Sequence, residues 1–359
     1  MTAPRRVIAH LDIDAFYASV ELQRHPEARG LPLVVAGSGP RSVVTTASYE
    51  ARRYGIDSAM PAARARVLCP DAIFIAPDFA AYRAKSREVW DIVRARFETV
   101  GQAGIDEAYL ELTALERPLP ALRELVAQVR ADTGLQVSVG VGPSRLVAKT
   151  ASSAFKPAAF VAMGREQAAA HFAAHPVRLL QGIGPKTAER LAAIGVKTVG
   201  DLQTGDVELL AQRFGERQAR ALNARANFHD DSPVETSRIA KSRSSELTFP
   251  ADVSDRAKLE ETLAELAREL GEGLRTRRRR ARTVAVKVRL DDWTTVTRAR
   301  TLPYFTDEGA TIAGTALELL RAYAPPRPVR LLGVRVASFD DEPQGAPATS
   351  ASAQLALRI

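Results

Sequence analysis

Cysteine is almost absent from this chain: Cys69 is the only one among 359 residues. A single thiol cannot build an internal disulfide framework or supply the several thiolates of a cysteine-based zinc site. Apolar runs of about 18 residues, which would predict a membrane-spanning helix, are also missing. The N-terminus, Met-Thr-Ala-Pro-Arg-Arg followed by a strand-like run and an acid, lacks the pattern of a signal peptide. These absences favour a cytoplasmic protein in a reducing compartment.

Charge of one sign is in excess. The formal net charge is +8 at pH 7, which predicts an anionic partner. Residues 275–300 hold ten basic residues against two acidic ones, Asp291 and Asp292. The ten are Arg275, Arg277, Arg278, Arg279, Arg280, Arg282, Lys287, Arg289, Arg298 and Arg300. Such clustering predicts a nucleic-acid-binding face rather than a uniformly basic surface.

Two acidic strings stand out against this basic background. Residues 12–21 read DIDAFYASVE and residues 105–112 read IDEAYLEL, and each string lies in an apolar, strand-like run. Ionised carboxylates in such a setting are costly unless they are paired or bind metal. Mg²⁺ takes carboxylate oxygens together with substrate phosphates. Two strands that bring acids to one point therefore indicate a site for phosphoryl or nucleotidyl transfer, although either string alone also fits an edge strand with solvated acids.

The chain changes character along its length. The acidic strings fall in a mixed β/α part, and residues 176–231 read as short helices with glycine-rich turns. Residues 232–242 lack periodicity and are predicted to be a linker. Residues 243–340 follow a βαββαβ pattern, and residues 341–353, rich in Pro, Ala, Ser and Thr, are predicted to be disordered.

A helix is predicted at residues 145–154. A strand at residues 136–141 precedes it, and Gly142-Pro143 ends that strand. Ser144 follows directly and can cap the helix with its hydroxyl.

Residues 180–188, LQGIGPKTA, predict a hairpin between helices. Gly182 and Gly184 allow backbone N–H groups to approach a phosphate, and helix N-termini favour anions. With Lys186 and Thr187 they form a candidate DNA-binding unit that contacts the backbone without reading bases. The plainer alternative is a helical turn with a glycine cap.

Residues 283–290, TVAVKVRL, alternate between two faces. Val284, Val286, Val288 and Leu290 share one face, whereas Lys287 and Arg289 share the other with Ala285. The apolar face is expected to pack on helices and the basic face to bind a nucleic-acid backbone. An ordinary half-exposed strand is the alternative. The candidate DNA-binding residues of this region are Lys241, Ser242, Arg243, Lys287, Arg289, Arg298, Arg300 and Arg335.

These motifs together resemble the Y-family of translesion DNA polymerases, most closely its DinB (DNA polymerase IV) branch. The string Asp-x-Asp-x-Phe-Tyr-Ala-Ser-Val-Glu and the string Ile-Asp-Glu-Ala-Tyr-Leu carry the resemblance. Residues 46–52, TASYEAR, match the family's finger motif, and residues 155–157, FKP, match the end of its palm. Lys241-Ser242 with residues 246–249, ELTF, match the start of its little finger.

The resemblance implies an α+β multidomain fold, the right-hand polymerase, over nearly the whole chain. Its parts are expected to be a palm of mixed sheet and helices (1–18 and 76–166), small fingers (19–75), a helix-hairpin-helix thumb (167–231), a linker (232–242), a βαββαβ little finger (243–340) and a disordered tail with a clamp-binding peptide (341–359).

The resemblance also implies a two-metal site. Asp12, Asp106 and Glu107 would be the catalytic carboxylates and hold two Mg²⁺ ions, helped by the Ile13 carbonyl, with Mn²⁺ able to substitute. One ion would lower the pKa of the primer 3′-hydroxyl, and the other would hold the triphosphate and the leaving pyrophosphate. Asp14 and Glu111 are expected to support the strands rather than bind metal.

A nucleotide pocket is implied beside the metals. Phe16 and Tyr17 would lie under the incoming sugar, and Tyr17 would be the steric gate against a ribose 2′-hydroxyl. The triphosphate would be held by Thr46, Tyr49, Arg52 and Lys156. Without the motif context, the tyrosines would be interpreted as core residues.

The implied activity is template-directed addition of dNMP to a primer 3′-hydroxyl, with low fidelity, in translesion synthesis during DNA repair and damage tolerance. Small residues around the finger motif predict tolerance of damaged template bases, and no proofreading domain is evident. Primer–template DNA and dNTPs are the expected substrates, and the protein is expected to be a monomer that binds no membrane. A sliding clamp is a further expected partner, bound by the terminal peptide with Gln354, Leu355, Leu357 and Ile359. The alternative is that this end of the chain is frayed and has no binding role.

The chain departs from the family pattern beside the second acidic string. The family usually has Glu and Ser where this chain has Gly101 and Gly104. This departure keeps open an accessory protein that binds DNA and clamp without polymerising. A palm-fold nucleotide cyclase also uses paired carboxylates and two metals, and a metal-dependent nuclease is a more distant alternative. The hairpin segment and the basic sheet argue against the cyclase, since a cyclase needs no grip on a duplex.

Overall fold

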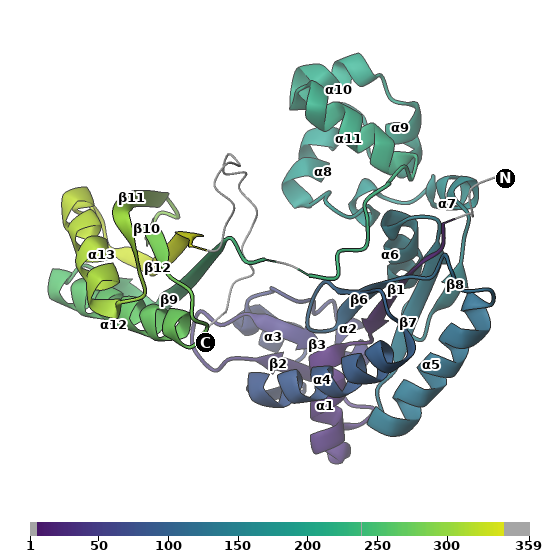
Figure 1. Cartoon of the computed structure of the whole chain (residues 1–359), viewed down its shortest axis with the longest axis horizontal. Coiled ribbons are helices and arrows are strands. Elements are labelled where there is room, and N and C mark those ends of the chain that lie inside the picture. The colour runs from purple at the N-terminus through teal and green to yellow at the C-terminus, as the bar shows by residue number, and fades with distance from the viewer. Residues whose placement is uncertain (1–5, 238, 341–359) are drawn as a thin grey trace. The chain divides into compact units, whose positions relative to one another are not determined.

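The computed structural model describes residues 6–237 and 239–340 (Figure 1). The chain divides into two compact units. The first spans the residues up to 36, residues 44–59 and residues 66–238, and the second spans residues 37–43, residues 60–65 and the residues from 239 onward. The predicted tail (341–359), with Gln354, Leu355, Leu357 and Ile359, lies outside the described residues.

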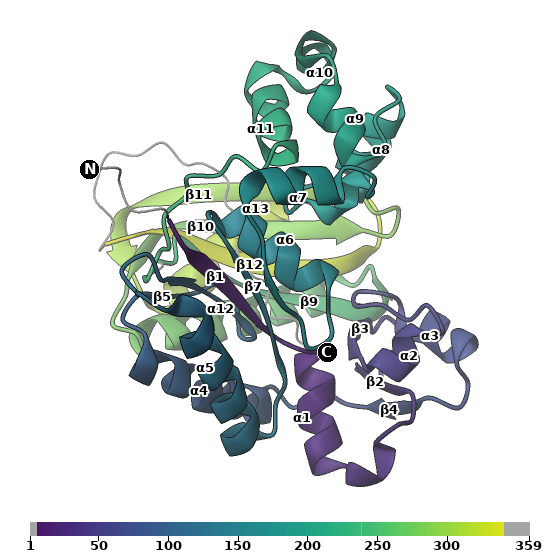
Figure 2. The same cartoon turned by 90° about the vertical axis from the view of Figure 1, so that its right-hand side faces the viewer.

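A five-stranded sheet forms the centre of the first unit, with strand order β5-β6-β1-β7-β8. The strands are β1 (Ile8–Ile13), β5 (Val100–Gln102), β6 (Glu107–Glu111), β7 (Val137–Gly142) and β8 (Phe160–Ala162). Every residue of β1 is buried, and β6 and β7 pair with it on its two sides, both antiparallel; Figure 2 shows β1 beside β7. The register places Asp12 opposite Glu107, so the two acidic strings meet across neighbouring strands.

Helices pack on this sheet through apolar side chains. They include α1 (Phe16–Arg24), α4 (Phe79–Arg96), α5 (Pro118–Thr133) and α6 (Arg145–Ala154). The predicted helix at 145–154 is confirmed, and the Ser144 hydroxyl caps it by accepting from the Val147 N–H. Backbone contact between α6 and β7 depends on Gly140, where a Cβ would lie 2.0 Å from the Ala148 carbonyl oxygen. A glycine thus lets α6 lie flat on the sheet.

A small three-stranded sheet, β3-β2-β4, follows α1 and a 3₁₀ turn, η1 (Pro26–Ala28). Its strands are β2 (Leu33–Ala36), β3 (Val44–Ala47) and β4 (Ile73–Ile75), accompanied by the helices α2 (Tyr49–Arg52) and α3 (Ala62–Leu68). The Ser48 hydroxyl caps α2 by accepting from the Ala51 N–H. This cap fixes the start of the segment that carries the predicted triphosphate-binding residues.

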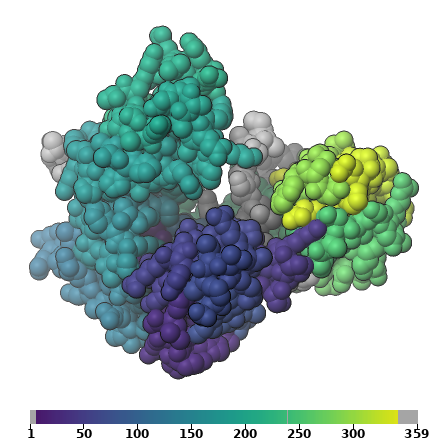
Figure 3. Space-filling view, turned by 180° about the vertical axis from the view of Figure 1, so that it is seen from behind, coloured from purple at the N-terminus to yellow at the C-terminus, as the bar shows by residue number. Residues whose placement is uncertain are grey.

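Short helices make up the rest of the first unit, seen as the teal atoms of Figure 3. They are α7 (Arg165–Phe172), η2 (Val177–Leu179), α8 (Pro185–Ala192), α9 (Val199–Thr204), α10 (Val207–Phe214) and α11 (Glu216–Ala226). Phe172, Leu191 and Leu222 belong to a core of their own. Gly182 has a left-handed backbone, φ +91°, in the turn that leads into α8, as the predicted hairpin requires.

The second unit has the predicted βαββαβ order. Its elements are β9 (Ser242–Val253), α12 (Arg256–Arg275), β10 (Ala281–Leu290), β11 (Thr295–Thr306), α13 (Gly309–Tyr323) and β12 (Val329–Phe339). The strands form one antiparallel sheet in the order β11-β10-β12-β9. Both helices cover one face, where Val284, Val286 and Val288 are buried. The predicted fold class is confirmed, and no helix within the described ranges is long and apolar enough to cross a bilayer.

The segment predicted as a linker (232–242) forms no helix or strand over residues 232–237, and its first part packs on the first unit. Residues 230–235 lie against the five-stranded sheet instead of running free, and we call this segment the strap. Its hydrogen bonds join Leu146 N to Asp230 Oδ2 (2.9 Å), Arg6 Nη2 to the Ser232 carbonyl (2.8 Å) and Arg145 Nη1 to the Pro233 carbonyl (3.2 Å). Val234 packs against a small apolar cluster that contains Ile8 and Tyr109.

The strap explains the glycine at position 101. A Cβ on Gly101 would lie 2.6 Å from the Glu235 carbonyl oxygen and 2.8 Å from Val234 Cγ1. Distances this short force the backbone to move. The missing side chain in β5 therefore provides the room in which the strap lies, and Gly101 is explained by packing.

Gly101→Ala is expected to displace the strap. The added methyl group clashes with backbone, and overpacking of this kind costs about 1–3 kcal/mol of unfolding free energy. Hydrogen exchange measured by mass spectrometry should rise at least about tenfold at residues 230–235. Gly314→Ala is the matched control, because nothing lies within 4 Å of a Cβ there. Unchanged exchange at the strap in Gly101→Ala would contradict this account of the glycine.

Candidate active site

The three predicted carboxylates meet at one end of β1 and β6. Asp12 and Glu107 are cross-strand partners, and the Ile13 N–H donates to the Asp106 carbonyl at 2.9 Å, which holds the second string beside the first. One potential ligand atom each from His10, Asp12 and Glu107 lies within 4.8 Å of the other two. The structure therefore brings the acids together as the sequence predicted, and it adds His10 to the cluster.

The electrostatics of the cluster point to a cation site. Burial, with the charges of Asp12 and Glu107 acting in the same direction, raises the pKa of Asp106 to about 6. Burial also acts to raise the pKa of Glu107, but the contacts with His10 and Lys149 outweigh it and lower that pKa to about 2. Asp106 is thus the carboxylate whose charge lacks full compensation, which fits a place for a divalent metal ion.

Two lysines compensate the other carboxylates. Lys149 of α6 forms an ion pair with Glu107, and Lys156 forms one with Asp12. Only Lys156 was named from the sequence; Lys149 and His10 were missed. The signals were available, since His10 is two residues before Asp12 on the same face of β1, and Lys149 is two helical turns before Lys156. Burial lowers the pKa of His10, so its imidazole is neutral.

Asp14 has the supporting role expected for it. It is 3 % exposed and accepts hydrogen bonds from Ser138 Oγ (2.7 Å), the Ala158 N–H (2.7 Å) and the Tyr49 hydroxyl (3.3 Å). With both oxygens occupied in this way, Asp14 ties together the end of β1, the loop after α6 and the start of α2. Glu111, the other support, accepts from Arg6 Nε at 3.2 Å.

The predicted triphosphate-binding side chains lie around Asp14. The Arg52 guanidinium is 4.8 Å from the centre of the Tyr49 ring, and its Nε donates to the Ala47 carbonyl at 3.1 Å. Burial and then the charge of Asp14 raise the pKa of Tyr49, so its hydroxyl is a neutral donor. Thr46 is buried in β3. Lys156 Nζ is 3.9 Å from Asp14, which places its positive charge in the same neighbourhood.

The two aromatic residues of the first acidic string, Phe16 and Tyr17, lie in different surroundings. Tyr17 stacks on Tyr82 with ring centres 4.4 Å apart and meets Phe79 edge-on at 5.9 Å. Burial raises the pKa of Tyr17, and the charge of Asp106 adds to this shift, so the ring lies near the carboxylate cluster. Phe16 is 3 % exposed and belongs to the main core. The Phe16 ring is thus part of the core, and its position under an incoming sugar stays a prediction.

The register of the second unit sorts its predicted cations onto two faces. Cross-strand partners share a face. Lys287, Arg289 and Arg335 alternate with the buried valines and lie on the face without helices. Opposite those valines, and so on the helix face, lie Arg298 (partner Val286), Arg300 (partner Val284) and Arg243 (partner Val336).

Two of these helix-face arginines already have partners on α13. Arg300 forms an ion pair with Glu318, and the Arg298 guanidinium is 5.4 Å from the centre of the Tyr323 ring. The single basic face expected from the sequence is thus smaller than predicted, and Lys287 on it also pairs with Glu246 at 2.7 Å. Lys241 and Ser242 stand at the beginning of β9.

The hairpin glycines lie at an accessible helix start. Gly184 is the N-cap of α8, and nothing lies within 4 Å of a Cβ built on it. Lys186 and Thr187 belong to the first turn of α8. A Cβ on Gly182 would be 3.6 Å from Nε of Arg225, a basic residue that sequence reasoning missed. A cleft of about 510 Å³ adjoins this turn, lined by Arg145, Leu146, Gln181, Gly182, Ala221, Ala224, Arg225, His229, Asp230 and Ser232.

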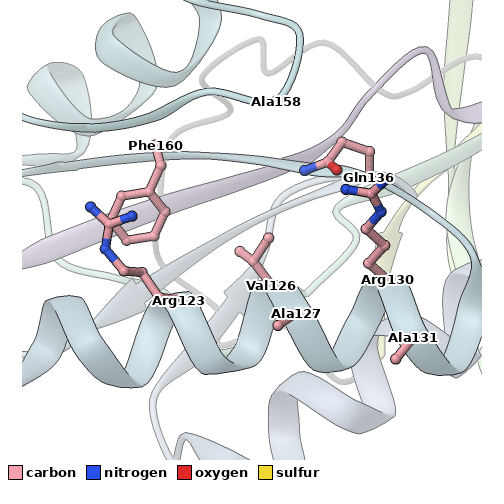
Figure 4. Close-up of a pocket in the computed structure, with 8 residues that line it drawn as sticks. All are labelled: Arg123, Val126, Ala127, Arg130, Ala131, Gln136, Ala158 and Phe160. Atoms are coloured by element: carbon pink, nitrogen blue, oxygen red, sulfur yellow. The ribbon is translucent and has the colours of Figure 1, made fainter.

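A larger groove, of about 730 Å³, lies elsewhere on the first unit (Figure 4). It is lined by Arg123, Val126, Ala127, Arg130, Ala131, Gln136, Ala158 and Phe160, from α5 and the strands beside it. The Arg123 guanidinium covers the Phe160 ring at 4.2 Å. No carboxylate contributes to this lining, so the groove is not the cation site.

Comparison with known families gives a match over most of the chain. Residues 11–153 match the impB/mucB/samB family, and residues 240–353 match the C-terminal domain of the same family. The chain belongs to the impB/mucB/samB family. Between those segments, residues 178–226 match the SAM-like helix-hairpin-helix tandem, in agreement with the hairpin at Gly182.

Similar proteins extend over nearly the full length. A DNA polymerase IV from Methanoculleus marisnigri is 41% identical over 95% of this chain and 96% of its own. One from Caulobacter vibrioides is 40% identical over 93% and 84%. A solved Y-family DNA polymerase chimera built from Dbh and Dpo4 has the same fold, with a TM-score of 0.83, 24% identity and coverage of 93% and 99%. The resemblance to the Y-family polymerases that the sequence motifs indicated is therefore confirmed.

Asp106→Asn is expected to stabilise the metal-free protein. The pKa of Asp106 is near 3.8 unfolded and about 6 folded, so above pH 6 the folded state holds an ionised carboxylate at a cost. Removal of that charge should add ~1–3 kcal/mol to the free energy of unfolding at pH 7.5. The gain should shrink as the pH falls from 6 towards 3.8, where folded and unfolded states are both protonated. Urea unfolding in EDTA, with exposed Asp91→Asn as the control, measures this; a gain independent of pH would contradict it.

Proposed function

We propose that this chain is a template-directed DNA polymerase that adds dNMP to a primer 3′-hydroxyl by two-metal-ion nucleotidyl transfer. The observation that carries the proposal is the convergence of Asp12, Asp106 and Glu107 at the end of β1 and β6. Its support from relatives is that proteins about 40% identical over nearly the whole chain are named DNA polymerase IV.

The residues present fit Mg²⁺, because the cluster offers carboxylate oxygens and an uncompensated charge on Asp106. Asp12, Asp106 and Glu107, with the Ile13 carbonyl, would hold two Mg²⁺ ions, and Mn²⁺ would substitute. Bound there, the ions supply a lowered pKa at the primer 3′-hydroxyl and charge stabilisation of the leaving pyrophosphate. Asp12 and Glu107 face each other across the ladder, so one cation can contact both strands.

The nucleotide would be held by Tyr49, Arg52 and Lys156, with Thr46 in β3 beside them. Asp14 positions two of these groups, since it accepts from the Tyr49 hydroxyl and from the backbone of the loop that follows Lys156. Lys156 would exchange its contact with Asp12 for the triphosphate, an anion of higher charge. Tyr17, braced by its stack on Tyr82, would be the steric gate.

Duplex DNA would be bound through its backbone. Gly182, Gly184, Lys186 and Thr187 offer N–H groups and a positive charge at the start of α8. Arg225 adds a second charge beside Gly182. On the second unit, the open face with Lys287, Arg289 and Arg335 would bind phosphates in a salt-dependent, sequence-independent manner.

The remaining expectations belong to this proposal. They are low-fidelity translesion synthesis without proofreading, a monomeric cytoplasmic protein, and a sliding clamp bound by Gln354, Leu355, Leu357 and Ile359. Lys241, Ser242 and Arg243 at the start of β9, and Arg298 and Arg300 on β11, stay predicted DNA contacts. Of these, Arg298 and Arg300 must first leave their partners on α13.

The purified protein should extend a primer on a template with dNTPs and Mg²⁺. Asp106→Ala should lower the rate by at least about a thousandfold, because it removes a metal ligand from the centre of the reaction. Asp132→Ala, at an exposed position of α5, is the control and should extend normally. Extension that survives Asp106→Ala would refute the metal assignment, and a wild-type protein that never extends would refute the polymerase.

Tyr17→Ala should admit ribonucleotides. Loss of the ring opens space at the sugar, so the ratio of dNTP to rNTP incorporation efficiency should fall roughly a hundredfold, mainly through the rNTP. Tyr54→Ala serves as the control, since that tyrosine is 52% exposed. Single-nucleotide incorporation kinetics with dATP and ATP give the ratio, and an unchanged ratio would remove the gate role from Tyr17.

A further inference from the structure

We propose that Lys149 is a built-in counter-cation that positions Glu107: it holds one carboxylate oxygen, leaves the other for the metal, and lowers the affinity of the nucleotide-free site for divalent cations. This inference rests on the proposed function, because it takes Glu107 as a metal ligand. Lys149 is here a positioning residue, since it acts through Glu107.

Two neighbours of the Glu107 carboxylate contact the same oxygen, Oε2. The Lys149 ammonium contacts Oε2, and His10 Nε2 lies 3.4 Å from the same oxygen. Neither of these contacts involves Oε1. The two neighbours therefore fix the rotation of the carboxylate through Oε2 and leave Oε1 out of both contacts, while Asp12 is the cross-strand partner of Glu107.

Lys149 is itself held in place. Its ammonium is 3.4 Å from His10 Nε2, and the His10 ring is fully buried. The other ring nitrogen of His10 is 2.7 Å from Ser152 Oγ, and that hydroxyl is 3.0 Å from the Lys149 carbonyl. With the ring proton on Nδ1, Nε2 can accept from the Lys149 ammonium; with the proton on Nε2, that N–H can donate to Glu107 Oε2, the oxygen that Lys149 also contacts. In both cases the buried ring limits the positions open to the lysine.

Comparison with Lys156 shows why Lys149 is the permanent cation of the pair. Lys156 follows the end of α6 in a loop and has a substrate anion to move to when nucleotide binds. Lys149 lies inside the helix, and its neighbours are Glu107 and the buried imidazole. Lys156 would thus move from Asp12 to the nucleotide phosphates, whereas Lys149 would stay paired with Glu107.

A fixed positive charge beside a metal ligand has two opposite effects. It repels a divalent cation, so metal binding without nucleotide is weakened. It also holds the ligand oxygen in one orientation, so the reaction is faster once nucleotide phosphates have brought the metal. Removal of Lys149 should therefore tighten metal binding and slow catalysis, a combination that a merely structural ion pair does not produce.

Mn²⁺ titration of the full chain, without DNA or nucleotide, followed by electron paramagnetic resonance, tests the first effect. Lys149→Met and Lys149→Gln should each bind Mn²⁺ at least fivefold more tightly than the wild type. Lys149→Arg, which keeps the charge, should restore the wild-type affinity. Lys85→Met, which removes an ion pair with Glu88 on α4, is the control and should leave the affinity unchanged. Two neutral variants are used so that the test still gives an answer if one of them fails to fold.

Single-nucleotide incorporation at saturating Mg²⁺ tests the second effect. Lys149→Gln should lower kcat at least tenfold with KM for dNTP changed less than threefold, because the triphosphate is held by other residues. Equal or weaker Mn²⁺ binding in the neutral variants would overturn the counter-cation, and an unchanged kcat would overturn the positioning. The Mn²⁺ titration needs no polymerase activity, so a failure of the proposed function, seen as wild-type protein that does not extend a primer, stays distinguishable.

Discussion

The first unit depends on placing three carboxylates at the junction of two strands that are otherwise apolar. Every residue of β1 is buried, and Asp12 lies 9% exposed at its end. Such charges are tolerated only with compensation. Lys149 and Lys156 supply it for Glu107 and Asp12, whereas Asp106 is left with a raised pKa. The site therefore carries an electrostatic cost that a bound cation would relieve.

Close backbone approach is the second constraint on this unit. Gly140 lets α6 lie on β7, which brings Lys149 within reach of the cluster, and Gly101 lets the strap lie on β5. A Cβ on Gly104 would lie 3.3 Å from Glu107 Cγ and 3.4 Å from Asp106 Oδ1, so this position directly adjoins two of the carboxylates. Of the two glycines beside the second acidic string, Gly101 thus has a clear packing reason.

Local patterns made much of this predictable. The alternation in residues 283–290, the cap at Ser144 and the two acidic strings each report on their own segment, and the elements formed as expected. What failed depends on pairing between distant segments. Only the register of β11 shows that Arg298 faces the helices, and only tertiary packing shows the strap against Gly101. His10 and Lys149 were missed although their spacing from Asp12 and Lys156 can be read in the sequence, because only the folded structure shows that they contact each other and Glu107.

Asp14 has a consequence for how the enzyme would select its substrate. One carboxylate accepts from Tyr49 at the start of α2 and from Ala158 in the loop after Lys156, so both sides of the nucleotide pocket share a single anchor. A pocket tied together before substrate arrives has no closing motion in which to test the fit of a base pair. Induced-fit selection is one of the main sources of fidelity in template copying. The proposed nucleotide pocket, preformed by these hydrogen bonds, would therefore give up that checkpoint and gain the ability to accept an imperfect pair.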